Sequence, residues 1–160
     1  MAEVADEAVR ERIIRLAFNG DESRMERFVN MLRRAVPQGT QVILRGSAVT
    51  GYRWADNQPF DADGPGTSDL DVTFLGADML ELWESFYIPK MHTTPLSEDY
   101  PEACPPLNNL RSKLSRLAAR PVNLQASIGL VQFARDVLFD QPYYTLIEAP
   151  DKDERETPAA

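Results

Sequence analysis

The 160-residue chain has a single cysteine, Cys104, and a single histidine, His92. One cysteine cannot form a disulfide within the chain, which is typical of a reducing compartment, so we expect a cytoplasmic protein. With so few of these residues we expect neither a zinc site nor a Ser-His-Asp triad. Cys104 lies among prolines without a neighbouring base, so we do not expect it to act as a nucleophile.

Long apolar segments and an excess of basic residues are missing as well. No stretch approaches the length of about 20 apolar residues that spans a bilayer, and the acidic N-terminus lacks the apolar core of a signal peptide. We therefore expect no membrane contact. The formal net charge of −8 argues against general nucleic-acid binding, because phosphate backbones would be repelled. The length predicts one domain over residues 1–150, and the charged segment 151–160 is predicted to be a disordered tail.

Apolar periodicity predicts the secondary structure. Helical spacing predicts helices over 6–18, 22–35, 77–88, 107–120 and 129–139, and short apolar runs predict strands over 41–45, 69–75, 122–126 and 143–147. Helices that alternate with a few strands indicate an α/β or α+β fold with a mixed sheet flanked by helices.

Three segments of this pattern carry further expectations. The helix 77–88 would bury Trp83 in the core, and the outer face of helix 107–120 would be solvated and basic, with Arg111, Lys113, Arg116 and Arg120. Segment 89–106 holds five prolines and shows no periodicity, so we expect either a lid or a loosely held surface connection.

Two aspartates on one predicted strand point to metal chemistry. Side chains alternate along a strand, so Asp69 and Asp71 share a face. Two carboxylates on one face resist ionisation unless a cation lies between them. The pair therefore predicts a divalent metal site with one or two ions, for which Mg²⁺ is the first candidate.

A Gly-Ser pair after the preceding strand supplies the other half of such a site. Gly46 permits a tight turn and the close approach of a ligand. Ser47 would begin a short helix whose free amide groups favour phosphate. We expect Ser68 to add a hydroxyl and Arg53 to contact the triphosphate. A metal beside a phosphate cradle is the apparatus of phosphoryl or nucleotidyl transfer.

Gly46-Ser47, Gly51 and Asp69-Leu70-Asp71 resemble the motifs of the nucleotidyltransferase superfamily, which has the fold of DNA polymerase beta. The resemblance covers about residues 41–76 and is strongest to small bacterial members. It implies a mixed sheet flanked by helices and Mg²⁺-dependent binding of an NTP such as ATP. It also implies transfer of the nucleoside monophosphate to an acceptor hydroxyl on a protein, a small molecule or an RNA end.

The chain departs from the family pattern at two places. The family has a third carboxylate on a later strand, and the matching position within 121–125 is Asn123. An amide brings no charge and cannot serve as a base, so transfer would be attenuated. The insert 55–66 is rich in turn residues and would border the nucleotide or the acceptor.

Two alternatives stay open at this point. The first is that the chain is a catalytically inactive, nucleotide-binding relative of these enzymes, which acts with a protein partner as a regulatory or toxin–antitoxin-type interaction module. On the simplest reading, Asn123 is only an outward-facing polar residue of a strand.

Overall fold

The computed structural model describes residues 6–149, so the predicted tail 151–160 lies outside the described residues. In chain order the elements are α1 (Asp6–Ala17), α2 (Glu22–Ala35), β1 (Gln41–Arg45), α3 (Ser47–Thr50), β2 (Leu70–Leu75), α4 (Ala77–Leu80), β3 (Phe86–Ile88), β4 (His92–Thr93), the 3₁₀ turns η1 (Pro101–Ala103) and η2 (Pro105–Leu107), α5 (Asn108–Ala118), β5 (Val122–Ser127), α6 (Leu130–Phe133), its π-helical continuation η3 (Ala134–Leu138) and β6 (Tyr143–Ile147).

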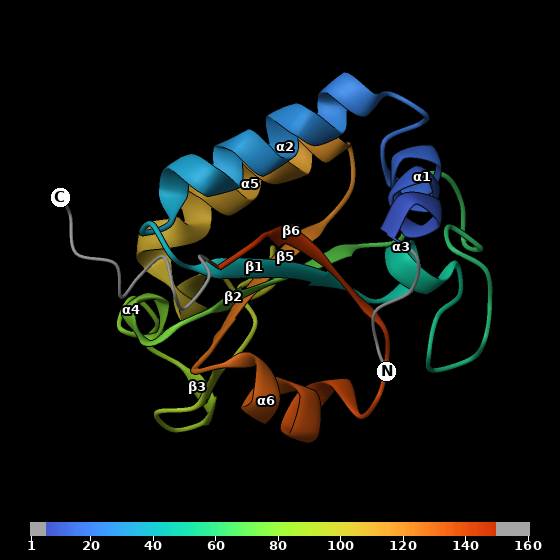
Figure 1. The fold of residues 1–160 in the computed structure, drawn as a ribbon. Helices are drawn as coiled ribbons and strands as arrows, with labels where there is room; N and C mark the ends of the chain where they lie inside the picture. The colour runs from blue at the N-terminus through green and yellow to red at the C-terminus, as the bar shows by residue number, and fades with distance from the viewer. Residues whose placement is uncertain (1–5, 150–160) are drawn as a thin grey trace, which may run out of the picture.

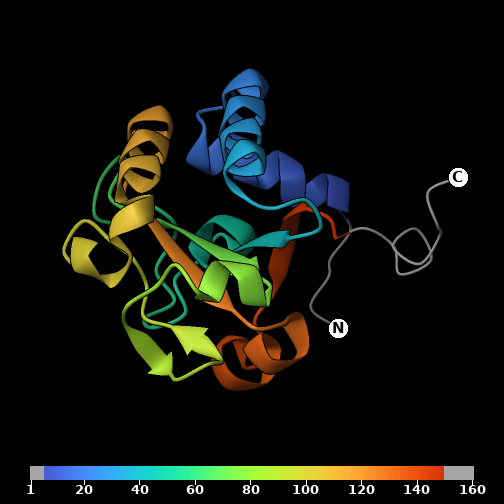
Figure 2. The same cartoon turned by 90° about the vertical axis from the view of Figure 1, so that its left-hand side faces the viewer.

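The strands form one mixed sheet of six strands in the order β3-β4-β5-β2-β1-β6. The central strands β2 and β5 are parallel, and the other neighbours are antiparallel. Helices α2 and α5 lie side by side over one face of the sheet, and α6 lies under the other (Figures 1 and 2). The predicted fold class, an α/β mixed sheet flanked by helices, is confirmed.

Strand alternation gives the sheet two different faces. The face under α2 and α5 is apolar and buried, and it is formed by Val42, Leu44, Leu70, Val72, Phe74, Val122, Leu124 and Ala126. On the other face, α6 and η3 cover a small apolar cluster of Ile43, Leu75, Phe133 and Leu138. The rest of that face is polar, with Asp71, Thr73, Asn123 and Gln125. Because the main core does not use these polar side chains, this is the face on which a site can be built.

The predicted helix over 77–88 is wrong. Helix α4 ends at Leu80, and Phe86–Ile88 form β3 instead. The aromatic and β-branched residues of β3 favour an extended chain. Two hydrogen bonds to distant segments hold it there, from the Glu84 amide to the Ala103 carbonyl (2.9 Å) and from the Thr94 amide to the Ser85 carbonyl (2.9 Å). Trp83 is nevertheless buried in the core, as predicted.

Segment 89–106 is neither a lid nor a loose connection. It contains β4 and two 3₁₀ turns, and the side chains of Leu96 and Cys104 are fully buried. Leu96 and Leu124 exchange two backbone hydrogen bonds, of 2.7 and 2.9 Å. The segment therefore covers the edge of β5, and its lack of periodicity reflects packing by irregular backbone rather than mobility.

The expected basic outer face of helix 107–120 is only half present. Lys113 and Arg116 are exposed, whereas Arg111 and Arg120 are buried. Arg120 follows the helix and turns inward, where it donates to the backbone carbonyls of Leu16, Ala17 and Ser68 and to both carboxylate oxygens of Asp61 (2.9 and 3.2 Å). Its guanidinium carbon also lies 4.6 Å from the centroid of the Phe60 ring.

Asp61 anchors the insert 55–66 to the rest of the fold through this ion pair. Burial alone would raise the pKa of Asp61, but Arg120 and the backbone amides of Ser68 and Gly66 hold that pKa below its usual value. The insert is thus a fixed part of the fold, joined to the end of α1 and to the residues just after α5. Within residues 6–149, no helix has the length and apolar character needed to cross a bilayer.

We predict that Arg120→Met lowers the free energy of unfolding by about 3–5 kcal/mol, because it leaves Asp61 as an uncompensated, largely buried charge. The exposed Arg116→Met is the matched control and should change it by less than about 0.5 kcal/mol. Urea unfolding at pH 7 measures both. Because the pKa of Asp61 is lowered in the folded state, the wild-type advantage is present above about pH 4 and is lost as the pH falls through that lowered value. A cost below about 1 kcal/mol for Arg120→Met would contradict this role.

Candidate functional site

Asp69, Asp71 and Asn123 converge on one point of the polar face. Asp71 and Asn123 are partners in the parallel register of β2 and β5, and Asp69 lies two residues before Asp71. The Asn123 side-chain nitrogen Nδ2 donates to Asp69 Oδ2 (2.8 Å) and to Asp71 Oδ1 (3.0 Å). The structure therefore confirms that the two aspartates share a face and places Asn123 between them.

Gly46 lies directly against the Asp71 carboxylate. Its φ of +93° belongs to the left-handed region, and a Cβ atom there would stand 3.2 Å from Asp71 Oδ2. Both observations require glycine, since any side chain would be strained and would press on the carboxylate. The turn is set by β1, which runs antiparallel to β2 and pairs Arg45 with Asp71.

The carboxylates open into a cleft of about 330 Å³. Its walls include most of the predicted site residues, namely Gly46, Ser47, Arg53, Ser68, Asp69 and Asp71. The other residues that line it were not predicted to belong to the site: Arg45, Trp54, Ala55, Thr67 and Gln141. Asn123 does not line the cleft and contacts it only through the two carboxylates.

The charges in the cleft are not balanced by the chain itself. Burial and the neighbouring Asp71 raise the pKa of Asp69, while the Asn123 amide and the positive charge of Arg45 act in the opposite direction. The fold thus holds two carboxylates together at a cost in free energy. A cation bound between them would relieve that cost.

Arg45 lines the cleft, although no motif in the sequence marks it. It closes β1, lines the cleft, and forms no ion pair within residues 6–149. Its Nε is buried without a hydrogen-bond partner, its Nη2 lies 3.5 Å from Gln125 Oε1, and its guanidinium carbon is 5.7 Å from the centroid of the Phe133 ring. The signal in the sequence was strand alternation, which places Arg45 on the same face as Ile43 and away from the main core.

Arg53 and Ser68 lie in the cleft wall, but both already have partners. Arg53 Nη1 binds Asp63 (2.6 Å), and its Nε and Nη2 bind the two oxygens of Asp56 (3.1 and 2.9 Å). The Ser68 hydroxyl accepts a hydrogen bond from the Asp61 amide (2.7 Å). These contacts hold the insert in place, and the nucleotide contacts predicted for Arg53 and Ser68 stay predictions.

The structure also contains a Ser-His-Asp chain, which the sequence had not led us to expect. His92 Nδ1 lies 2.8 Å from Ser127 Oγ, and His92 Nε2 lies 2.7 Å from Asp136 Oδ2. His92 and Ser127 are both 0% exposed, so the serine hydroxyl cannot reach a substrate. The chain of hydrogen bonds links β4, β5 and η3 and belongs to the scaffold.

The side chain of Cys104 is fully buried. Burial raises the pKa of its thiol to about 11, so the thiol stays protonated at neutral pH. Its Sγ donates to the Leu82 carbonyl (3.2 Å).

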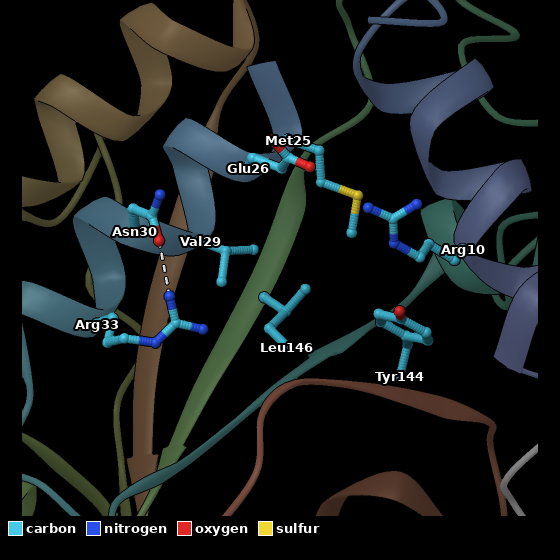
Figure 3. Close-up of a pocket in the computed structure, with 8 residues that line it drawn as sticks. All are labelled: Arg10, Met25, Glu26, Val29, Asn30, Arg33, Tyr144 and Leu146. Carbon is cyan, nitrogen blue, oxygen red and sulfur yellow. Dashed lines mark hydrogen bonds between the residues drawn. The ribbon is translucent and has the colours of Figure 1, made fainter. Parts of the chain in front are cut away.

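A second hollow, of about 300 Å³, lies on the other side of the sheet between α1, α2 and β6 (Figure 3). Its two arginines are engaged, Arg10 with Glu22 (2.9 Å) and Arg33 with Asn30 (2.6 Å). Its volume is close to that of the cleft, so size does not decide between them. The donor set does, because of these two hollows only the cleft presents paired carboxylates, Asp69 and Asp71.

The donor set of the cleft fits Mg²⁺. Within residues 6–149 there is no group of three acidic, histidine or cysteine side chains that could hold a metal. Mg²⁺, however, is usually bound by one or two carboxylates together with waters and substrate phosphates. Asp69 and Asp71 supply those carboxylates, and a half-turn of the Asn123 amide would exchange its nitrogen for the oxygen Oδ1, a ligand of the same hard type.

Comparison with models of known protein families found no match. Neither the curated proteins nor the solved structures contain a match to the chain.

We predict that Asp69→Asn raises the free energy of unfolding of the metal-free protein at pH 7.5, by about 0.5–2 kcal/mol, the usual gain when a functional strain is removed. An amide carries no charge to be buried beside Asp71, yet its oxygen can still accept from Asn123. Because the pKa of Asp69 is raised in the folded state, its carboxylate destabilises the fold increasingly as the pH rises above about 4, the usual aspartate value, and fully above the raised value. The difference between variant and wild type should shrink as the pH falls to about 4 and disappear below it, where Asp69 becomes protonated in both the folded and the unfolded state. Thermal unfolding over this pH range measures it, and a destabilised variant at pH 7.5 would contradict the charge repulsion.

Proposed function

We propose that this protein is a Mg²⁺-dependent nucleotidyltransferase, which binds an NTP in the cleft and transfers its nucleoside monophosphate to an acceptor hydroxyl. The observation that carries the proposal is the convergence of Asp69 and Asp71 beside Gly46, on the polar face of the sheet. Two neighbouring carboxylates repel each other, and a divalent cation bound between them removes that repulsion. The resemblance of Gly46-Ser47 and Asp69-Leu70-Asp71 to nucleotidyltransferase motifs supports the same conclusion.

The residues of the cleft divide the task between them. Asp69 and Asp71 would hold Mg²⁺, which when bound neutralises phosphate oxygens and polarises the phosphoryl group. Gly46 leaves room for a phosphate at the turn, and Ser47 faces the same cleft at the start of α3. Arg45 offers a guanidinium that can pair with a phosphate oxygen, which is the geometry that arginine recognises well.

The reaction would be an in-line displacement. The acceptor oxygen forms a bond to the α-phosphorus, the bond from that phosphorus to the bridging oxygen breaks, and pyrophosphate leaves. The acceptor proton passes to solvent, because the Asn123 amide cannot accept it. The net charge of −8 favours a protein or a small molecule as acceptor over an RNA end. The single cysteine, whose thiol is buried, supports a cytoplasmic location.

One observation favours a second candidate, nucleotide binding without transfer. Asn123 stands where the resemblance implies a third carboxylate, and its amide donates one hydrogen bond to each of the two aspartates without adding a charge or a base. Such a protein would act as a nucleotide-responsive interaction module with a protein partner. Pyrophosphate release separates the two candidates, since only the transferase produces it.

We predict that wild-type protein binds ATP in the presence of Mg²⁺ and that Asp69→Asn/Asp71→Asn loses this binding by about tenfold or more, since a ligand pair of charge −2 is removed. Calorimetric titration of ATP, GTP, CTP and UTP with Mg²⁺ or with EDTA measures it. Far-UV circular dichroism checks that the double variant is folded, so that lost binding is not assigned to unfolding. Equal binding with EDTA, or no binding of any nucleotide by wild type, would refute the proposed function.

We predict further that Arg45→Gln weakens the binding of Mg²⁺ with inorganic tripolyphosphate by about tenfold, the worth of one charge-assisted hydrogen bond to phosphate. Tripolyphosphate carries the phosphates without sugar or base. Arg53→Gln is the matched comparison, and it should change this affinity less than twofold, because the Arg53 guanidinium is already bound to Asp56 and Asp63. Both aspartates are exposed, so their unpaired charges would be screened by solvent and salt. The reverse order of the two variants would assign the phosphate contact to Arg53.

A further inference from the structure

The two tryptophans of the chain have opposite surroundings. Trp83 is 4% exposed and belongs to the core, whereas Trp54 is 75% exposed and lines the cleft that holds Asp69 and Asp71. Tryptophan is on average a highly buried residue, and an indole left in water forgoes the stabilisation that its large apolar surface would give. A lone exposed apolar residue needs no explanation on an open surface, but Trp54 stands in the wall of a cleft with a phosphate-type donor set.

The backbone that carries Trp54 is fixed on both sides. The Arg53 amide donates to the Gln58 carbonyl (2.7 Å), and the Asn57 amide donates to the Arg53 carbonyl (2.9 Å). The Arg53 side chain is held by Asp56 and Asp63, and Tyr52 pairs with Pro59 across the base of the loop. The backbone at Trp54 is therefore ordered before any ligand arrives, so binding does not have to order this turn.

The ring itself is free to accept a partner. Among residues 6–149, no aromatic ring or cation packs on the indole of Trp54. The cleft volume of about 330 Å³ lies within the range of about 300–1,000 Å³ usual for small-molecule sites. The charged side chains of the cleft suit phosphates and a metal ion. Trp54 provides a flat apolar surface that suits the face of a heterocyclic base.

We propose that Trp54 is the nucleobase platform of the cleft, on which the base of the bound nucleoside triphosphate stacks while its phosphates lie toward Asp71 and Ser47. The inference rests on the proposed function and adds the part of the substrate that the charged residues do not recognise. Stacking accepts any base, because each has a π face, and it favours purines through their larger area. Recognition by Trp54 therefore gives broad NTP binding with a modest preference for ATP and GTP.

The experiment compares two probes on four proteins. ATP and inorganic tripolyphosphate, each with Mg²⁺, are titrated by calorimetry into wild type, Trp54→Ala, Trp54→Phe and Tyr87→Ala. Tyr87 is also exposed, but it lines a different hollow with Thr94 and Pro95, so it is the matched control for loss of a surface aromatic. Far-UV circular dichroism checks that each variant is folded. We expect that it is, because the substituted side chains are exposed and do not contribute to the core.

Trp54→Ala should weaken ATP about 5- to 150-fold, the range for loss of one base–aromatic stack, and should leave tripolyphosphate within twofold of wild type. Trp54→Phe should retain most of the ATP affinity, and Tyr87→Ala should change the affinity for neither probe. Unchanged ATP affinity in Trp54→Ala, or an equal loss for both probes, would overturn the platform. If wild type binds tripolyphosphate but ATP no more tightly, the platform fails and the phosphate site stands. If wild type binds neither, the proposed function fails and the platform fails with it.

Discussion

The buried ion pair between Arg120 and Asp61 is the contact on which the site depends most. Arg120 joins the last residues of α1, the end of α5, the insert and Ser68 in one set of hydrogen bonds. Ser68 directly precedes Asp69, so this contact fixes where the first carboxylate stands before β2 begins. A buried charge that is well paired is a weak source of net stability but a strong constraint on geometry. Here the constraint falls on the wall of the cleft.

The cleft itself follows from strand alternation. Even-numbered residues of β2 and β5 fill the core under α2 and α5, which leaves the odd-numbered residues free to be polar. Asp71 and Asn123 meet there because the two strands are parallel and in register. Burial, together with repulsion from Asp71, raises the pKa of Asp69, and this cost to the stability of the fold falls where the proposed Mg²⁺ would bind.

Much of this arrangement could be predicted from the sequence, because its signals are local. The periodicities that defined α1, α2, β1 and β2, and the shared face of Asp69 and Asp71, need only neighbouring residues. The predictions that were wrong concern segments whose structure depends on contacts with residues far away in the chain. Residues 77–88 have helical spacing, yet hydrogen bonds to Ala103 and Thr94 draw the second half into a strand. Arg120 was predicted to be solvated, but it is buried because Asp61 of the insert lies beside it and accepts its hydrogen bonds. Arg45 and Trp54 meet in the cleft because separate elements contribute its walls, and no motif in the sequence marks either residue.

The sequence by itself determined the mixed α/β class, the two carboxylates on one face, the glycine turn and the amide at Asn123, because each follows from residue type and from periods of two or 3.6. Only the tertiary structure decided what those residues meet. It brought Asn123 between the aspartates, left Arg45 without an ion-pair partner among the described residues, engaged Arg53 with Asp56 and Asp63, and set Trp54 at the cleft. The physical reason is that partners far apart in the chain become neighbours only when strand order and register are fixed, and these are set by the packing of the whole core.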